Sequence, residues 1–403
     1  MKRFLFALTL LFSISAAGFG QSYFPGSWGN WENKTPQEAG FNPEKLQAAI
    51  EYAQSQESQS PRNLEENHYL GFGREPFGDG VGPFKTRGEQ TGIIIKDGYI
   101  VAEWGEPFRV DMTFSVSKSF LSATVGLAYD RGLIRDVYDT VDEYMAPILV
   151  VEEVRGHRKA ERLGEEKMME PFKSEHNSSI TWDHLLRQTS DWEGTLWGKP
   201  DWADRPSRNR SEWLNRPKNE PGTVWEYNDV RVNLLALAAT NVIRTPLPAF
   251  LKANLMDKIG ASPTWRWHGY ENSWIVLDGR MVQVPSGGGH WGGGMFLSAR
   301  DQARFGLLTL NRGMWNNEQI LSEDWVTKSL TPTDVKTDYG FMNWFLNTDQ
   351  KQLPSAPETA FLHVGAGTNM VYCDPEHNLV IVARWITNDA KDGIVKRVLE
   401  AME

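Results

Sequence analysis

A serine and a lysine separated by two residues stand in an apolar segment, residues 113–127, with the sequence TFSVSKSFLSATVGL. Residues three positions apart lie on one face of a helix, so the Ser115 hydroxyl and the Lys118 ammonium can meet in one site. A serine hydroxyl becomes a good nucleophile when a neighbouring group removes its proton, and a desolvated lysine can do this. The free N–H groups at the start of such a helix also favour negative charge. The pattern predicts a nucleophile and its base.

The same four residues also fit an ordinary N-cap serine followed by a lysine on a solvated face. The residues that follow Lys118 argue against this alternative, because residues 120–128 are too apolar for a surface helix. We therefore expect Lys118 to be buried.

Length and charge narrow the class of protein. A chain of 403 residues can bury a large core and is expected to form two lobes. A net charge of −10 without a run of Lys or Arg argues against a nucleic-acid partner. The eight histidines show no ligand spacing, so neither a metal nor another cofactor is predicted. The segment GGGHWGGG, residues 287–294, lacks the lysine of a phosphate loop and is expected to connect the lobes.

The N-terminus is typical of a secretory signal. Lys2 and Arg3 precede an apolar stretch that is too short to cross a bilayer, and small residues follow it. Residues 1–20 are therefore predicted to be a signal peptide, and the mature protein is predicted to be periplasmic or secreted. No cysteine follows that could carry a lipid anchor, and the single Cys373 cannot form an internal disulfide.

Local patterns predict the elements around the serine. A helix is expected at residues 43–55, and a hairpin at residues 91–104, where Asp97-Gly98 separates two β-rich runs. Helical patterns dominate the middle of the chain, at residues 180–192, 232–243 and 246–260. β-rich runs return only at residues 358–373 and 379–386.

These patterns predict an α/β protein. An antiparallel sheet flanked by helices is expected from residues 21–111 and 291–403, with an inserted, mostly helical lobe at residues 112–290 and the active site between the two. The charged stretch at residues 151–173 is expected to be a solvated insertion.

Five segments occur in the order found in the serine β-lactamase and penicillin-binding protein superfamily: SVSKSF, ITWDHLLRQTS, PGTVWEYND, GGGMFLSARDQARFGLL and HVGAG followed by YCDPEHNLVIVARW. From about Pro36 onward the chain resembles the branch that contains class C β-lactamases, family VIII esterases, D-aminopeptidases and 6-aminohexanoate-dimer hydrolases. The resemblance implies a β-lactamase/transpeptidase-like fold and a serine nucleophile, and it does not define the substrate.

The resemblance also implies roles for single residues. Ser115 would be acylated, Lys118 would be its base partner, and Tyr227 would carry the proton to the leaving group and then activate water. A phenol with a reference pKa near ~10 needs the charge of Lys118 to stabilise its phenolate. The family motif Tyr-x-Asn has Asp229 here in place of asparagine.

Asp229 changes the expected chemistry. An ionised aspartate only accepts hydrogen bonds, and near Lys118 it would stabilise the ammonium form. Activity should then rise toward alkaline pH, and substrates that carry an amine should be preferred. Alternatively, Asp229 turns away and pairs with Arg231 or caps a turn.

The third family motif, Lys-Thr-Gly, is replaced by His363-Val364-Gly365. The resemblance implies an oxyanion hole formed by the backbone N–H groups of Ser115 and Ala366, worth about 3 kcal/mol per donor. Gly365 would allow the backbone to approach the substrate, and His363 would line the site without acting as the base. We expect most tryptophans to lie in the core of the helical lobe and one or two to wall an acyl pocket, with Trp192, Trp197 and Trp291 as candidates.

Three functions fit these features. The favoured one is an exported hydrolase that cleaves small esters or amides through a Ser115 acyl-enzyme. A β-lactamase or D-amino-acid peptidase is less favoured because the lysine that could bind a substrate carboxylate is missing. A binding protein without turnover is disfavoured because Ser115, Lys118 and Tyr227 are all present. The oligomeric state is not indicated.

Overall fold

The computed structural model describes residues 23–150, 167–215 and 217–403. The predicted signal peptide and most of the charged stretch, residues 151–166, lie outside the described residues.

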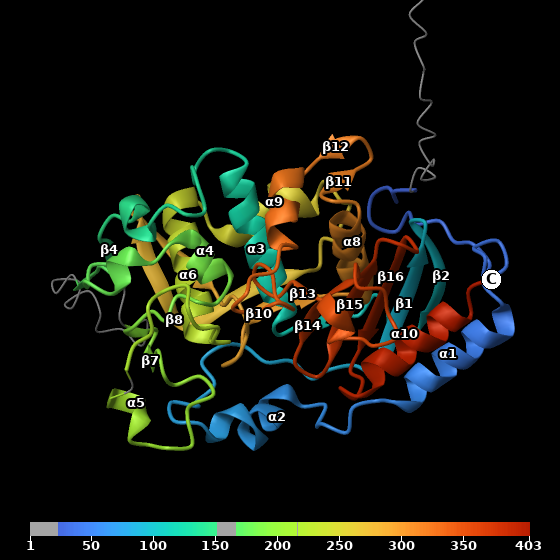
Figure 1. The fold of residues 1–403 in the computed structure, drawn as a ribbon, viewed down its shortest axis with the longest axis horizontal. Coiled ribbons are helices and arrows are strands. Elements are labelled where there is room, and N and C mark those ends of the chain that lie inside the picture. Colours follow the sequence, from blue (N-terminus) through green and yellow to red (C-terminus); the bar gives the residue numbers. More distant parts are fainter. Residues whose placement is uncertain (1–22, 151–166, 216) are drawn as a thin grey trace, which may run out of the picture.

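A six-stranded antiparallel sheet forms one half of the fold (Figure 1). Its order is β13 (Phe345–Leu346), β14 (Phe361–Gly365), β15 (Asn369–Asp374), β16 (Leu379–Arg384), β1 (Thr91–Lys96) and β2 (Tyr99–Trp104). The predicted hairpin is confirmed as β1 and β2, with positive φ at both Asp97 and Gly98 as its two-residue turn requires. Strands from the two ends of the chain pair directly, because β1 lies beside β16.

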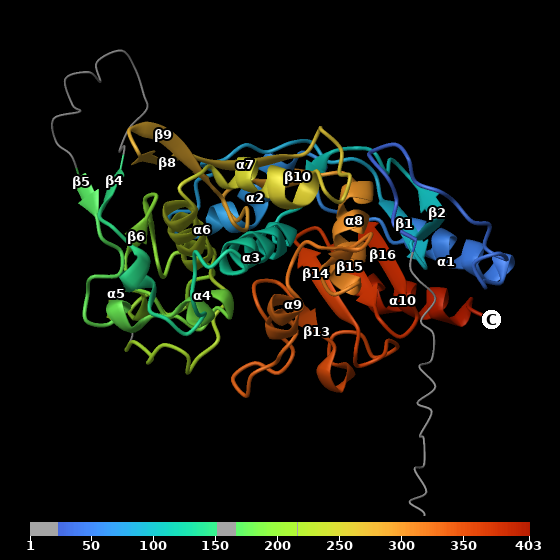
Figure 2. The same cartoon turned by 90° about the horizontal axis from the view of Figure 1, so that it is seen from above.

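Helices cover both faces of this sheet (Figure 2). The predicted helix α1 (Pro43–Ser55) is confirmed and packs with α10 (Ala390–Glu400) on one face, while α8 (Ala299–Leu310) covers the other. Alternate side chains of the strands enter the two cores, as in β1, where Ile94 faces α1 and α10 and Ile93 faces α8.

A second sheet was not expected. Its order is β3 (Asp111–Met112), β10 (Gly294–Leu297), β8 (Arg266–Leu277), β4 (Ile148–Val150) and β5 (Lys167–Met169), with β9 (Arg280–Pro285) also on β8. The prediction that β-rich runs return only after residue 358 is therefore wrong. The β8–β9 hairpin turns at Asp278-Gly279. A register shift between Gly269 and Trp274 interrupts the alternation of inward and outward side chains along β8, so the sequence does not show a regular strand pattern.

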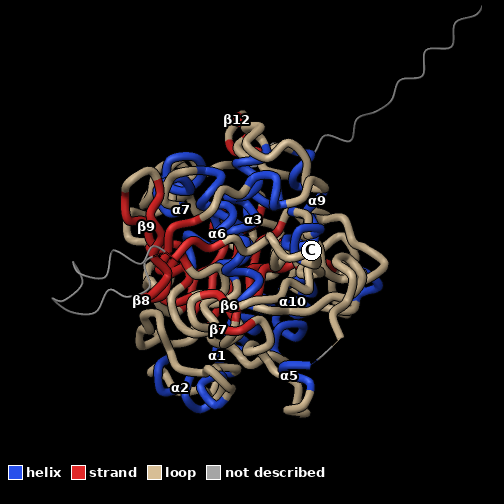
Figure 3. Tube along the Cα trace, turned by 90° about the vertical axis from the view of Figure 1, so that its left-hand side faces the viewer, coloured by secondary structure: helices blue, strands red, loops and turns tan. Residues whose placement is uncertain are grey.

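Helices join the two sheets. The apolar segment that contains Lys118 forms α3 (Val116–Tyr129), which packs against α6 (Asp229–Ile243) and β14. Figure 3 shows that the part of the molecule carrying α6 and α7 (Leu247–Leu251) also carries β8 and β9. The helix expected at residues 180–192 is short, because α4 (Trp182–Leu186) ends where Gln188 and Asp191 adopt positive φ.

The remaining elements are short: α2 (Leu64–Leu70), η1 (Phe72–Arg74), η2 (Val141–Tyr144), η4 (Asn177–Ser179), β6 (Thr195–Leu196), β7 (Lys199–Pro200), α5 (Glu212–Asn215), η5 (Lys252–Met256), β11 (Met314–Trp315), β12 (Glu318–Gln319), α9 (Glu323–Ser329) and η6 (Thr348–Gln350). Among the described residues no single helix is long and apolar enough to cross a membrane, and one bent pair, α6 with α7 and η5, reaches the threshold by length and composition. The architecture is mixed α/β, with an antiparallel sheet flanked by helices and a second sheet region. The division into two lobes at residues 112 and 290 stays a prediction.

Candidate active site

Ser115 is the residue that precedes the first turn of α3. Phe114 before it has a φ of 49°, a left-handed conformation that costs a non-glycine residue about 1 kcal/mol or more. Ser115 is also the one residue between Asp111 and Ala128 that is not buried. A strained turn thus presents a partly exposed hydroxyl at the start of a buried helix.

Lys118 contacts both Ser115 and Asp229. Its Nζ donates to Ser115 Oγ at 2.9 Å and to Asp229 Oδ1 at 2.6 Å. The side chains of Lys118 and Asp229 are 0% and 1% exposed, so this is a buried ion pair. The helical spacing of Ser115 and Lys118 brings the two side chains together, and the lysine is buried as expected.

The charge state of this pair follows from its surroundings. Burial raises the pKa of the Asp229 carboxyl, but the positive charges of Lys118 and Arg205 outweigh this and hold its pKa below the usual range. Asp229 is therefore ionised, and its carboxylate forms a buried ion pair with Lys118 at 2.6 Å.

Asp229 does not pair with Arg231, which was the alternative expectation. Arg231 binds Asp191 at 2.6 Å and Glu226 at 2.9 Å. The second oxygen of Asp229 accepts from the backbone N–H of His290 at 3.2 Å. Both Asp229 oxygens thus have partners within the protein, and the expected preference for amine-bearing substrates stays a prediction.

Tyr227 lies next to the ammonium of Lys118. The Nζ is 4.6 Å from the centre of the Tyr227 ring, and the Tyr227 hydroxyl donates to Asn343 Oδ1 at 3.3 Å. Burial and the negative charge of Asp229 raise the pKa of Tyr227 well above its usual value, against a smaller opposing effect of a hydrogen bond with Ser115. Tyr227 is thus a neutral phenol at rest.

The cap of α6 positions Tyr227 and Asp229 together. The Asn228 side chain accepts from the N–H groups of Val230 and Arg231 at 3.0 and 3.2 Å, which makes it the N-cap residue. Tyr227 and Asp229 are the two neighbours of this N-cap residue, and the side chains of both lie beside Lys118.

The glycine segment at residues 287–294 contacts the ion pair. A Cβ added to Gly288 would lie 2.1 Å from Asp229 Oδ2 and 2.3 Å from Lys118 Nζ, closer than real Cβ atoms come. The backbone therefore covers the pair directly, a contact that was not expected of a connecting loop. Only glycine fits here, because it has no side chain to displace either charge.

Replacing Gly288 with alanine should therefore displace Lys118 from Ser115 and lower kcat by about tenfold or more, since small misplacements of catalytic groups have large effects. The control is Gly26→Ala, whose Cβ would meet no atom closer than 3.8 Å at an ordinary φ. Ester hydrolysis and thermal unfolding should be measured on both variants. Full activity of a folded Gly288→Ala protein would contradict the prediction.

The end of β14 runs against the backbone of Thr113 and Ser115. A Cβ on Gly365 would lie 2.0 Å from the carbonyl oxygen of Thr113 and 3.1 Å from the Ser115 nitrogen. Gly365 thus permits a close backbone approach, next to the residue expected to donate the second N–H group, Ala366. The oxyanion hole of Ser115 and Ala366 stays a prediction.

His363 does not line the site. It is 0% exposed, its Nε2 lies 3.3 Å from Thr309 Oγ1 on α8, and its ring packs against Phe305 and Trp344. Burial lowers the pKa of His363 to about 3, so it is neutral. Side chains alternate along β14, and His363 shares the core face with Phe361, which corrects the expectation.

The three candidate tryptophans also lie in the core. Trp192, Trp197 and Trp291 are 3%, 6% and 0% exposed and belong to one hydrophobic cluster, so they cannot form the wall of an open pocket. The aromatic rings nearest to Tyr227 are instead those of Trp225 and Tyr339, with centres 5.9 and 6.4 Å away.

Asn343 was missed by the sequence analysis. Its Nδ2 donates to the Val364 carbonyl at 2.9 Å while its Oδ1 accepts from Tyr227, so it ties Tyr227 to β14. It stands in no recognised motif, and its φ of 62° is invisible in the sequence. No local signal could have identified it.

An ionic network behind Asp229 was also missed. Asp204 accepts from the backbone N–H of Asp229 and pairs with Arg205, and the His290 ring lies between Asp204, at 3.4 Å, and Glu75, at 2.8 Å. Glu75, Asp204 and His290 offer ligand atoms within 4.8 Å of one another. However, the two ring nitrogens of His290 face different carboxylates, and Arg205 already neutralises Asp204. The arrangement fits an ion-pair network better than a metal centre.

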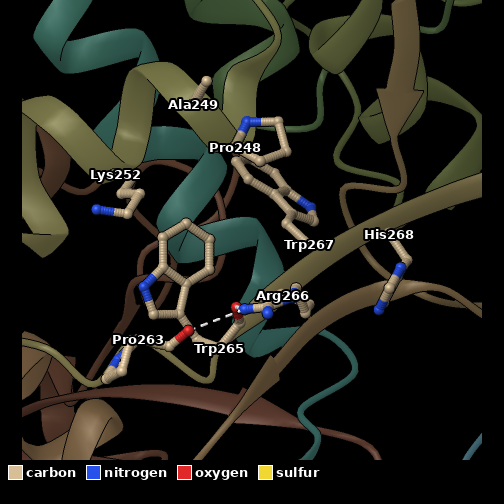
Figure 4. Close-up of a pocket in the computed structure, with 8 residues that line it drawn as sticks. All are labelled: Pro248, Ala249, Lys252, Pro263, Trp265, Arg266, Trp267 and His268. Carbon is tan, nitrogen blue, oxygen red and sulfur yellow. Dashed lines mark hydrogen bonds between the residues drawn. The ribbon is translucent and has the colours of Figure 1, made fainter.

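A surface pocket of about 270 Å³ lies elsewhere, between α7 and β8 (Figure 4). Its lining residues are Pro248, Ala249, Lys252, Pro263, Trp265, Arg266, Trp267 and His268. None of them contacts Ser115, Lys118 or Tyr227, so this pocket is separate from the candidate active site.

A serine hydroxyl bonded to a buried lysine one helical turn away, beside a tyrosine, is the site of a serine hydrolase. The family model described as Beta-lactamase matches residues 93–398. The protein belongs to the beta-lactamase family and is a serine hydrolase of that family. A sequence search of the curated proteins finds no match.

Solved structures share the fold at low sequence identity. EstCE1, a hydrolase with promiscuous acyltransferase activity, has a TM-score of 0.53 at 14% identity, covering 89% of this chain and 99% of its own. SurE with D-Leu has a TM-score of 0.54 at 14% identity, and the match covers 89% of this chain and 76% of SurE. A Bacillus anthracis protein assigned as a 6-aminohexanoate-dimer hydrolase has a TM-score of 0.50 at 16% identity, and the match covers 95% of this chain and 88% of that protein.

Proposed function

We propose that the protein hydrolyses small esters or amides through an acyl-enzyme on Ser115. The observation that carries the proposal is the 2.9 Å hydrogen bond between Lys118 Nζ and Ser115 Oγ, within a buried cluster that includes Tyr227 and Asp229. An activated serine hydroxyl of this kind forms covalent intermediates with carbonyl substrates.

The reaction would proceed in two steps. Ser115 Oγ attacks the carbonyl carbon as its proton passes to the Lys118–Tyr227 pair, and the N–H groups of Ser115 and Ala366 bind the oxyanion. Tyr227 then gives a proton to the leaving alcohol or amine, which departs. Water attacks the acyl-enzyme with the same pair as base, releasing the acid and restoring Ser115.

The proton on Tyr227 must be removed before this chemistry can begin. Burial and the negative charge of Asp229 raise the pKa of Tyr227 and favour its neutral phenol, so Tyr227 is not a ready base at rest. One proton must leave the cluster before Ser115 can be activated. The proposal therefore includes a rate that rises toward alkaline pH.

The printed names of the similar proteins bear on substrate class. The names of EstCE1 and the 6-aminohexanoate-dimer hydrolase favour ester and amide cleavage. The complex of SurE with D-Leu favours the alternative, a D-amino-acid peptidase. A β-lactamase is less favoured because His363, in place of the family lysine, is buried and neutral.

A substrate panel with covalent labelling tests the proposal. The protein should hydrolyse short-chain esters or linear amides faster than D-amino-acid amides or a chromogenic β-lactam, and Ser115→Ala should abolish turnover. A serine-directed phosphonate should add once per chain, at Ser115, as measured by mass spectrometry of the intact protein. Labelling that persists in Ser115→Ala, or the fastest turnover on the β-lactam, would overturn the proposal.

We also propose that the protein is exported, on the basis of the charged, apolar and small residues that open the sequence. Expression of the full chain followed by cell fractionation and N-terminal sequencing tests this. A protein that stays in the cytoplasm with Met1 intact would contradict it.

A further inference from the structure

We propose that the pocket between α7 and β8 is a second ligand site, which binds a small planar aromatic carboxylate (Figure 4). The pocket is separate from Ser115, so this inference goes beyond the proposed function and does not depend on it. It rests on three properties of the pocket: flat apolar walls, a cation without an anionic partner, and an unused N–H donor.

The walls of the pocket are flat and apolar. Trp267 on β8 and Trp265 just before it stand two residues apart, so their side chains lie on the same face of the chain. They are 5% and 6% exposed, and Trp267 Nε1 donates to the Ser286 carbonyl at 2.8 Å, which fixes that ring. Pro248 and Pro263 add rigid apolar surface (Figure 4). Such preformed walls suit a flat aromatic ring.

A π-helical turn forms part of the lining. In η5 (Lys252–Met256), which follows α7, the N–H of Asp257 donates to the Lys252 carbonyl five residues earlier, at 2.9 Å. Turns of this kind are rare and are frequently found at functional sites. Here the turn carries Lys252, one of the lining residues.

Arg266 supplies a positive charge that no acidic side chain in the described ranges neutralises by an ion pair. Its Nη1 donates to the carbonyls of Pro263 and Trp265 at 2.9 and 2.7 Å, which holds the guanidinium in place. Nε and Nη2 make no hydrogen bond to the described residues, and these two nitrogens form an edge that can bind a carboxylate bidentately.

The other two basic side chains of the pocket do not call for a second anion. Lys252 Nζ donates to both carboxylate oxygens of Asp257 at 2.7 Å. Burial, with a smaller contribution from the charge of Arg266, lowers the pKa of His268, so His268 is neutral at pH 7. The charge of the pocket thus matches a ligand with a single negative charge.

The indole N–H of Trp265 is a further free donor. Trp265 is 6% exposed, and its Nε1 has no hydrogen-bond partner in the part of the chain that the structure describes. A polar group so far removed from water gains from an acceptor on a ligand. The pocket volume of about 270 Å³ is close to the lower limit of about 300 Å³ for ligand sites, which restricts the ligand to one or two rings.

Two ligands of the same shape test the charge. Titration calorimetry should show tighter binding of 2-naphthoate than of the neutral 2-naphthamide. Arg266→Gln should weaken the binding of 2-naphthoate by about tenfold or more, the scale of one charged bidentate contact, and leave that of 2-naphthamide nearly unchanged. Arg280→Gln, which removes an exposed cation from the turn end of the same hairpin, should change neither affinity.

A substitution that fills the pocket tests the location. Ala249 lines the pocket from an exposed position on α7, so Ala249→Trp can fill the space without disturbing the core. This variant should bind neither ligand. Ala48→Trp, the same change at an exposed position of α1, should bind both as the wild type does. Thermal unfolding of each variant shows that it is folded.

Equal affinity for the two ligands, or an affinity for 2-naphthoate that Arg266→Gln leaves unchanged, would overturn the assignment of a carboxylate. Binding that survives in a folded Ala249→Trp protein would overturn the assignment to this pocket.

An aromatic acid can also enter the serine site, so the titration is repeated on protein whose Ser115 carries the phosphonate. The affinity for 2-naphthoate should be unchanged, and a loss of binding would place the ligand at Ser115 and overturn the inference. If Ser115 resists the phosphonate, the proposed function fails, while the comparison of Ala249→Trp with Ala48→Trp still decides where the ligand binds.

Discussion

Replacing Lys118 with alanine or Tyr227 with phenylalanine should each lower kcat by roughly a hundredfold or more, the scale of general acid–base catalysis. The double variant should be little worse than either single variant. In the proposed mechanism both side chains serve one proton transfer from Ser115, and Lys118 Nζ bonds to Ser115 Oγ and lies 4.6 Å from the centre of the Tyr227 ring. Groups that act as a unit show strongly non-additive losses.

Steady-state kinetics on one ester, with a double-mutant cycle, measures this coupling. Lys118→Ala leaves Asp229 buried without its cation, which costs about 3–5 kcal/mol of stability. Lys118→Gln, which can still donate to Asp229, and thermal unfolding of each variant therefore separate lost catalysis from lost folding. Tyr129→Phe, at the far end of α3, is the matched tyrosine control, since its hydroxyl donates to Asp324 at the surface. A double-variant loss equal to the product of the single losses would refute the coupled role.

Replacing Asp229 with asparagine should move the alkaline limb of the pH–rate profile to lower pH by about one unit or more, the usual effect of removing an adjacent charge. The sign follows from Tyr227. The negative charge of Asp229 raises the pKa of Tyr227, so removing that charge lowers it.

Activity at neutral pH, expressed as a fraction of the wild-type maximum, should consequently be higher in Asp229→Asn than in the wild type, as long as the protein folds. The profile of kcat/KM between pH 6 and pH 10 is the measurement, because it reports the free enzyme. Asp191→Asn is a useful control, since it removes a buried carboxylate that pairs with Arg231 rather than with Lys118. If the alkaline limb stays in place in a folded Asp229→Asn protein, Asp229 is structural and does not tune the base.

Several features of this protein are determined locally, and the sequence predicted them. Ser115 and Lys118 meet because three residues on a helix return the chain to the same face. The β1–β2 hairpin forms because Asp97-Gly98 accepts the positive φ of a two-residue turn. Tyr227 and Asp229 could be assigned because they stand in a short motif beside a helix cap. Each of these signals lies within a few residues of the feature it predicts.

Other features depend on which distant segments pack together. Gly288 covers the ion pair, Asn343 holds Tyr227 and Arg205 reaches its ring, yet these residues come from three loops far apart in the chain. The direction of a strand side chain is equally non-local, because a shift of one residue exchanges the two faces, and this is why His363 was expected in the site but lies in the core. Local sequence thus determined that Ser115 and Lys118 meet, whereas only the tertiary packing decided the charges and donors that surround them.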